Sequence, residues 1–336
     1  MAVNDDYFFP PLPRPSARVL AKHFLLLGVT FCTATIAGVL YPFGLIYTLP
    51  DADPQSWPEI GQFITSLPLR YASLIGDAVS RIFTDTTYLV YGLSFSLSLV
   101  FILLSHEMGH YIACRIYRVD ATLPYFIPTP PMIGPAGTFG AFIKIRSPMP
   151  SRRAVFDIGV AGPIAGFLAL IPVAIVGVAT MHPATAQQLA EPGGIVFADP
   201  LFMKLVRFVF GVDPSVSVGN PFYYAAWIGL LVTALNLIPS GQLDGGHAIY
   251  AVLGKKVHRW TGLIAFVIMA TLAVSGWFYF NSPSGFLVAV LLGVMMRVRH
   301  PEPWDQSPLD KKRKAVAFLV LIMFVLCFTP FPLQIS

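Results

Sequence analysis

Long apolar segments constrain this chain of 336 residues more than any other feature. A helix needs about 20 mostly apolar residues to cross the hydrocarbon core of a membrane. Only 12% of the residues are charged, against about 25% in soluble domains. We therefore expect an all-α polytopic protein, one membrane domain over 1–336, with transmembrane helices near 19–41, 87–114, 155–180, 222–239, 260–280, 284–297 and 314–331.

The distribution of basic residues predicts how these helices are oriented in the membrane. With seven spans, 18 of the 22 Lys and Arg residues fall on one side, and four fall on the other: Arg70, Arg81, Lys204 and Arg207. The positive-inside rule then places the N-terminus in the cytoplasm. Without the short span at 284–297 the basic cluster beside it would change sides, so we keep that span. Lipid headgroups account for the basic charge, and no nucleic acid is implied.

Three stretches between the spans are irregular. Segments 42–86 and 181–221 are predicted to be short extracytoplasmic loops, too short for an ordinary domain, and 201–212 within the second is predicted to be an interfacial helix. Segment 121–150 holds too many Pro and Gly residues for a helix. Within it, Thr138 to Arg146 alternates with a period of two, which is typical of a strand. We expect a β-hairpin here, either re-entrant in the membrane or on the cytoplasmic surface.

One predicted span carries ionisable groups, which are expensive in hydrocarbon unless they are paired or bind a metal. His106, Glu107 and His110 form the pattern H-E-x-x-H. On a helix, residues four apart share a face, so both imidazoles can reach one ion with the glutamate beside it. Imidazole and carboxylate donors in an open site favour Zn²⁺.

A third metal ligand has to come from elsewhere at the same depth. The two histidines lie roughly 7 to 14 Å inside the cytoplasmic end that Arg115 and Arg118 mark. Asp244 lies about 16 Å from Lys255 if the intervening segment is helical, on the same side. Depth and topology therefore predict that His106, His110 and Asp244 bind the metal together.

Other candidates are assigned less direct roles. Asp157 follows Arg152 and Arg153, which favours an ion pair over metal binding. Cys114 lies one turn beyond His110 and could close the site as a fourth ligand, although closure would remove the position for water. Apart from this possibility, the three cysteines are predicted to pack as small hydrophobic residues. His247 is predicted to support the site from outside the ligand set.

The sequences HEMGH and NLIPSGQLDGG, which begin at His106 and Asn236, resemble the two motifs of the site-2 protease family of intramembrane zinc metalloproteases. The resemblance covers 86–256, which would be the catalytic core. It implies that His106, His110 and Asp244 are zinc ligands and that Glu107 is catalytic. Neither extracytoplasmic loop is long enough for the PDZ domain of many members, so the chain looks like the PDZ-lacking branch, similar to plastid and bacterial forms.

This family would cleave transmembrane segments of membrane-anchored proteins near the cytoplasmic side, in a bacterial inner membrane or a plastid-type membrane. Asn236 could donate a hydrogen bond to the developing oxyanion or form an interhelical hydrogen bond. Gly162 and Gly166 form a GxxxG pattern, which predicts close helix packing. A divalent-metal transporter or sensor using the same three ligands is the alternative, and an inactive homologue acting as a membrane chaperone is a third possibility. The oligomeric state is left open.

Overall fold

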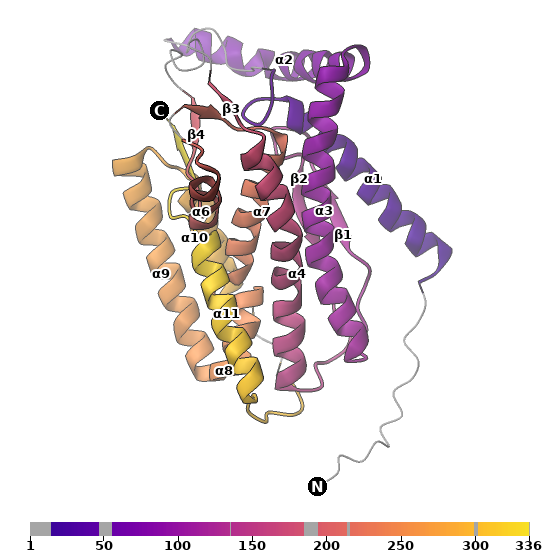
Figure 1. Ribbon diagram of the computed structural model, residues 1–336, viewed down its shortest axis with the longest axis vertical. Coiled ribbons are helices and arrows are strands. Elements are labelled where there is room, and N and C mark those ends of the chain that lie inside the picture. Colours follow the sequence, from indigo (N-terminus) through magenta and orange to yellow (C-terminus); the bar gives the residue numbers. More distant parts are fainter. Residues whose placement is uncertain are drawn as a thin grey trace.

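The computed structural model describes residues 15–46, 56–134, 136–184, 194–213, 216–298 and 302–335. It is mostly helical, and a helix lies at each of the seven segments expected to span (Figure 1). Four of these helices are long and apolar enough to cross a membrane, namely α1 (Ala17–Val39), α3 (Thr86–Ile116), α4 (Arg152–Ala179) and α9 (Lys255–Phe280). The crossing of α7 (Pro221–Leu237), α10 (Ser284–Met295) and α11 (Lys311–Cys327) stays a prediction.

Polar caps start most of these helices where the apolar runs begin. Ser151 accepts a hydrogen bond from the Ala154 backbone at the start of α4, and Asn220 does the same for Tyr223 at the start of α7. Such caps satisfy backbone N–H groups that have no partner inside the helix. Two further helices, α6 (Leu201–Phe210) and α8 (Asp244–Leu253), are short. α6 confirms that a helix lies within 201–212, and its position at the membrane interface stays a prediction.

The segment 42–86 is more than the loop we expected. It contains α2 (Trp57–Thr84), a helix of 28 residues of which only Ala78 and Ile82 are buried. The Ser56 hydroxyl accepts a hydrogen bond from the backbone amide of Glu59 in the first turn and donates one to the Glu59 carboxylate. Figure 1 shows α2 lying across one end of the bundle, over the start of α3.

Within the described residues, three short two-stranded sheets accompany the helices. Strands β1 (Tyr125–Pro128) and β2 (Thr138–Phe142) pair antiparallel within 121–150, so strands form where period-two alternation predicted one. β2 ends earlier than the predicted 138–146, and an isolated bridge joins Ala121 to Ile145. The other sheets pair β3 (His182–Pro183) with β5 (Ser217–Val218) and β4 (Ile195–Phe197) with β6 (Leu333–Ile335).

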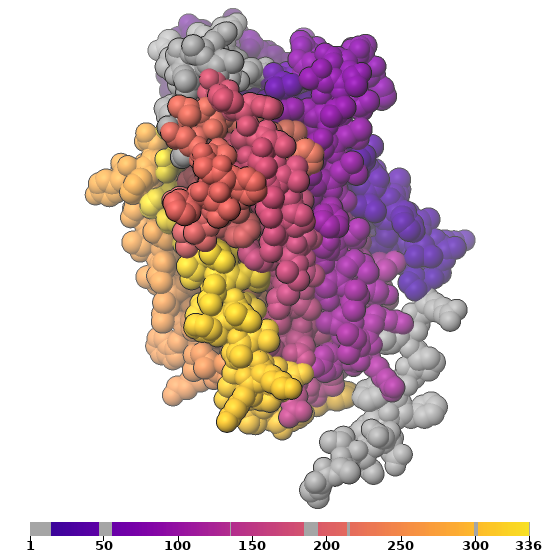
Figure 2. Space-filling view, viewed as in Figure 1, coloured from indigo at the N-terminus to yellow at the C-terminus, as the bar shows by residue number. Residues whose placement is uncertain are grey.

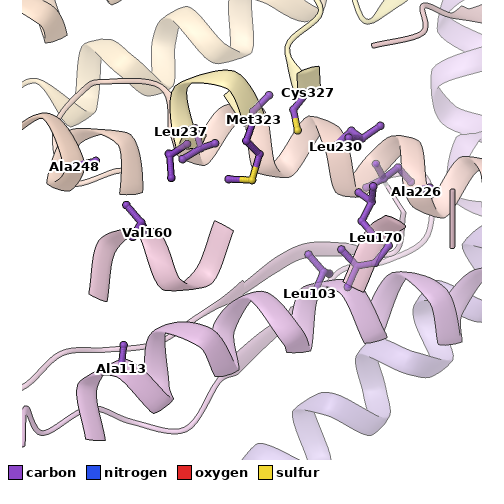
Figure 3. Close-up of a cluster of buried hydrophobic side chains, with 14 of the residues drawn as sticks. Leu103, Ala113, Val160, Leu170, Ala226, Leu230, Leu237, Ala248, Met323 and Cys327 are labelled. Carbon is purple, nitrogen blue, oxygen red and sulfur yellow. The ribbon is translucent and has the colours of Figure 1, made fainter. Parts of the chain in front are cut away.

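The main core lies where α3, α4, α7, α8 and α11 meet. Figure 3 shows Leu103, Leu170 and Ala226 together between α3, α4 and α7. Gly229 of α7 lies so close to Leu170 that an added Cβ would be 2.8 Å from its side chain. The packing of α4 against α3 is the most extensive in the molecule and fixes the helix that carries H-E-x-x-H.

Candidate metal centre

The two histidines of H-E-x-x-H lie on α3, and the aspartate lies at the start of α8. His106 and His110 are buried, and their Nε2 atoms are 3.2 Å apart. One carboxylate oxygen of Asp244 lies 3.3 Å from Nε2 of His106, and the other lies 3.3 Å from Nε2 of His110. The structure thus brings together the three residues predicted to bind the metal.

These distances test whether the residues fit zinc. At zinc–ligand distances of about 2.0–2.1 Å, two tetrahedral ligands are about 3.3–3.4 Å apart. The observed spacings of 3.2 and 3.3 Å match that edge length. In the part of the chain that the structure describes, this trio is the one group of three such side chains close enough to hold an ion. The donor set, the spacing and the burial all fit zinc.

The ring orientation of His110 is fixed by a backbone carbonyl. Its Nδ1 lies 2.7 Å from the carbonyl oxygen of Ile158 on α4, and a carbonyl can only accept a hydrogen bond. Nδ1 therefore carries the proton, and the lone pair on Nε2 is free to face the metal position.

Glycines of α4 make room for both imidazoles. A Cβ on Gly162 would lie 2.1 Å from Nε2 of His110, and one on Gly166 would lie 3.0 Å from Cβ of His106. A Cβ on Gly159 would likewise lie 2.7 Å from Cβ of His247. The GxxxG pattern predicted close helix packing, and α4 does pack against α3. The side chains that pack against Gly162 and Gly166 are those of the two candidate metal-binding histidines.

A glycine pair places the third donor. A Cβ on Gly245 would lie 2.0 Å from the carbonyl oxygen of Leu237, and one on Gly246 would lie 2.5 Å from that of Gly241. Only residues without side chains let α8 begin this close to the end of α7. Asp244 is the first residue of α8, where the helix dipole stabilises a carboxylate.

The donors open into a cavity of about 500 Å³. Glu107, Asn236 and His247 line it, as do residues 141–145 at the end of β2. Glu107 is buried, and the backbone amide of Ile143 interacts with its carboxylate. The amide nitrogen of Asn236 lies 3.4 Å from Nε2 of His106. The segment after β2 is the part of the site that the motifs did not reveal.

Asp157 and Cys114, which the sequence offered as further candidates, are not among the three grouped donors. Asp157 forms an ion pair, as expected, but its partner is Arg313 of α11 rather than Arg152 or Arg153. Arg152 instead donates hydrogen bonds to the carbonyl oxygen of Ala251 at 2.7 and 3.1 Å. Cys114 is buried in the main core and is not among the three grouped donors.

Comparisons with known proteins agree with the site. A family model described as peptidase family M50 matches residues 94–275, more than half of the chain. The probable zinc metalloprotease EGY1, chloroplastic, of Arabidopsis thaliana is 32% identical over 238 residues, which are 68% of this chain and 41% of that protein. Its namesake in Oryza sativa subsp. japonica is 31% identical over 68% of this chain and 38% of its own length.

The probable zinc metalloprotease EGY2, chloroplastic, of Arabidopsis thaliana is 26% identical over 82% of this chain and 49% of its own length. The chain thus spans about two fifths to one half of these relatives. No solved structure matches it. The resemblance to the site-2 proteases is confirmed, and the extent of both the family match and the identity to EGY1 shows that this chain belongs to peptidase family M50.

Proposed function

We propose that the chain is a zinc metalloendopeptidase that hydrolyses peptide bonds in the membrane segments of membrane-anchored proteins. One observation carries the proposal: a single cavity is lined by three zinc-type donors, by the buried carboxylate of Glu107, which is not one of the three, and by the end of β2. A transport or sensing site would need the donors but not Glu107, which lies beside them without joining their group. Family membership and the names of the relatives favour the same activity.

The chemistry divides between the metal and the side chains. Zinc held by His106, His110 and Asp244 would supply an acidified water and a Lewis acid for the substrate carbonyl. Glu107 takes the proton of the attacking water and passes it to the leaving amide nitrogen. The Ile158 carbonyl keeps the proton of His110 on Nδ1 throughout, so that Nε2 remains a ligand.

Asn236 lies in the same cavity and can act on the substrate. We assign its amide N–H as a donor to the oxyanion that develops on the substrate carbonyl. Such a donor contributes about 2.7–4 kcal/mol where one has been removed from other enzymes. The alternative role is a hydrogen bond between α7 and α3, since its amide nitrogen lies 3.4 Å from Nε2 of His106. This ring nitrogen has one lone pair, so it can accept this hydrogen bond only while it holds no metal.

Substrate presentation is assigned to the hairpin. The carbonyl of a helical peptide bond is covered by its own hydrogen bond, so the cleaved segment has to be extended. β2 pairs with β1 on one edge, and residues 141–145 at its end line the cavity. We propose that an unwound substrate adds to this cavity-facing edge as a further strand.

The contacts of the hairpin favour a re-entrant position. Near its start, the Pro124 carbonyl accepts a hydrogen bond from His23 of α1, at 2.8 Å. Near its tip, the Gly137 carbonyl accepts one from Thr33 of α1, at 2.7 Å. His23 and Thr33 are ten positions apart on α1, or about 15 Å along the helix axis. If α1 crosses the membrane, the hairpin runs beside it through a large part of the hydrocarbon.

We further propose a multi-pass location in a plastid-type or bacterial inner membrane with a cytoplasmic or stromal N-terminus. The relatives named as chloroplastic support the plastid setting. The distribution of basic residues supports the orientation.

The test uses the full chain in proteoliposomes with a panel of single-span reporter proteins. Wild type should cut at least one reporter within its apolar segment. Glu107→Gln should keep its zinc and lose at least about 100-fold in rate, because it removes only the proton carrier. Asn236→Ala should keep zinc and lose about 100-fold in kcat if its amide serves the oxyanion.

His110→Ala is the matched control, since it should lose both zinc and activity. Equal processing of the panel by wild type and Glu107→Gln would remove the protease assignment. An unchanged kcat in Asn236→Ala would leave that residue with the interhelical role alone.

A further inference from the structure

An arginine of the last helix reaches the first turns of α4. Arg313 lies in the first turn of α11, beyond the residues 94–275 that the family model matches. Figure 1 shows α11 beginning at the end of the bundle where α4 begins, and Figure 2 shows α11, in yellow, on the near face of the molecule. α11 contacts both α4 and α8. A residue near the end of the chain therefore lies beside the helix that packs against both imidazoles.

Each nitrogen of the Arg313 guanidinium donates a hydrogen bond. Nε lies 2.9 Å from one carboxylate oxygen of Asp157, and Nη2 lies 2.6 Å from the other. Nη1 donates to Asp310, whose carboxylate also caps the first turn of α11. The paired hydrogen bonds to Asp157 are a bidentate arrangement that a planar guanidinium forms and an ammonium cannot. This geometry fixes the position of the Asp157 carboxylate as well as balancing its charge.

Tyr117 joins α3 to this pair. It follows the last residue of α3 and lies two turns beyond His110. Its hydroxyl donates to the Asp157 carboxylate and accepts a hydrogen bond from Nη2 of Arg313, at 3.1 Å. The side chains of Tyr117, Asp157 and Arg313, which we call the arginine clamp, therefore connect α3, α4 and α11 at one point.

The arginine clamp lies next to the backbone group that orients a ligand. Ile158 follows Asp157 in the same turn of α4, and its carbonyl accepts the hydrogen bond from Nδ1 of His110, at 2.7 Å. A displacement of the Asp157 end of α4 relative to α3 would move this carbonyl away from the imidazole. The arginine clamp opposes that displacement, because it binds Asp157 to a residue at the end of α3.

The contacts between α3 and α4 make the site sensitive to small movements. A Cβ on Gly109 of α3 would lie 2.4 Å from the carbonyl oxygen of Ala161 on α4. The imidazole of His110 fills the space beside Gly162 in the same way. Closely packed elements cannot adjust continuously without losing contacts. A change of a few tenths of an ångström at the arginine clamp is therefore transmitted to the imidazole.

We infer that Arg313 is a positioning residue of the metal centre. Bound to Asp157 and Tyr117, it holds α4 against α3. The Ile158 carbonyl then meets Nδ1 of His110, and Nε2 faces the metal position. The inference rests on the zinc site of the proposed function and does not depend on which bond the enzyme cuts.

The experiment measures the zinc affinity of the full chain in detergent, by competition with a chromophoric chelator. Arg313→Gln should lower zinc affinity about fivefold, less than the roughly 10–100-fold effect of changing a partner that touches a ligand directly. Arg313→Lys should lower it similarly, because it keeps the charge but not the planar fork. Lys314→Gln is the matched control, since Lys314 is the next residue of α11 and is exposed.

A double-mutant cycle separates positioning from general stability. Asp157→Asn should lower zinc affinity about as much as Arg313→Gln, and the double variant should lose little more, because both changes open the same clamp. The visible absorption of Co²⁺ bound in place of zinc depends on ligand geometry, and it should change in both single variants but not in Lys314→Gln. A purely structural role would lower the unfolding temperature and leave zinc affinity and this absorption unchanged.

Three outcomes would overturn the inference: wild-type zinc affinity in Arg313→Gln, full recovery in Arg313→Lys, or fully additive losses in the double variant. If Arg313→Gln does not fold, Tyr117→Phe decides, because it removes one hydroxyl and leaves the pair of Arg313 and Asp157 in place. Its zinc affinity should also fall, and an unchanged value would overturn the inference. If wild type binds zinc but cuts no reporter, the protease assignment fails and the same affinities still decide the role of Arg313.

Discussion

Gly162 has no side chain, and the His110 imidazole fills the space in which one would lie. The H-E-x-x-H motif is therefore incomplete without a residue 52 positions later that binds nothing itself. A methyl group at Gly162 has to displace the ring, and the ring cannot move without breaking the hydrogen bond from Nδ1 to the Ile158 carbonyl. We therefore expect metal binding to depend on this position as well as on the three donors.

Gly162→Ala should therefore lower zinc affinity by at least about tenfold, the effect typical of disturbing a residue that orients a ligand. Zinc content after dialysis against a weak chelator measures it. Gly76→Ala is the control, because a Cβ on this exposed glycine of α2 would meet nothing within 4 Å. Zinc retention equal to that of wild type in Gly162→Ala would show that the imidazole has room to shift.

At the residue scale, sequence patterns predicted which three donors lie together, but they did not predict the contacts of the residues around them. His106, His110 and Asp244 followed from helical spacing and membrane depth, because both depend on counting residues along a helix. The predicted ion-pair partner of Asp157 was wrong. Arg153 was favoured because it lies one helical turn away in sequence, whereas the packing of α11 brings Arg313 to Asp157 in the fold. A tertiary contact over 156 residues leaves no local signal.

At the scale of elements, the segment at the end of β2 lies between the assigned proton carrier and the proposed position of the substrate. The Ile143 amide, just beyond β2, interacts with the Glu107 carboxylate, and the neighbouring residues line the cavity. Backbone at this position therefore touches both the assigned proton carrier and the proposed substrate edge.

Ile143→Pro removes this N–H and should abolish cleavage while zinc stays bound, since none of the three donors is touched. Ile143→Ala is the control, because it keeps the N–H and shortens only the side chain. Both variants are assayed for zinc content and for cleavage of the same reporters. Full activity in Ile143→Pro would contradict the strand-addition step.

Helix α2 escaped prediction because its apolar residues alternate with polar ones and no long apolar run marks it. A local signal was nevertheless present. Ser56 and Glu59 form the S-x-x-E pattern of a capping box, with Pro58 in the first turn, where proline is tolerated. One strand at 138–146 was predicted because Phe142, Lys144 and Arg146 alternate with Ile143 and Ile145 there. Its pairing partner at 125–128 could not be predicted from that alternation.

At the scale of the whole molecule, one small sheet limits how the chain can cross a membrane. β6 follows α11 and pairs with β4, which follows α4. The ends of α4 and α11 therefore lie on the same side, and the chain between them crosses an even number of times. If α9 crosses the membrane, it would by itself give an odd number, and we then expect at least one of the shorter helices to cross as well.

If α1, α3 and α4 each cross once, the chain crosses the membrane three times before the end of α4 and an even number of times after it. The total number of crossings is then odd, and the two termini lie on opposite sides of the membrane. Reporter enzymes that work on only one side of the membrane, fused to either end of the full chain, test this. We expect the two fused reporters to lie on opposite sides of the membrane, with the N-terminal reporter on the side that holds most Lys and Arg residues. Activity from both fusions on one side would exclude seven crossings.

The glycines at 159, 162 and 166 also offer a criterion for sorting relatives of this chain. A genome survey that identifies these proteases by H-E-x-x-H alone would classify a homologue with leucine in place of Gly162 as an active protease. In this architecture such a homologue could not seat the imidazole of His110, and it would be a pseudoenzyme that still displayed every ligand.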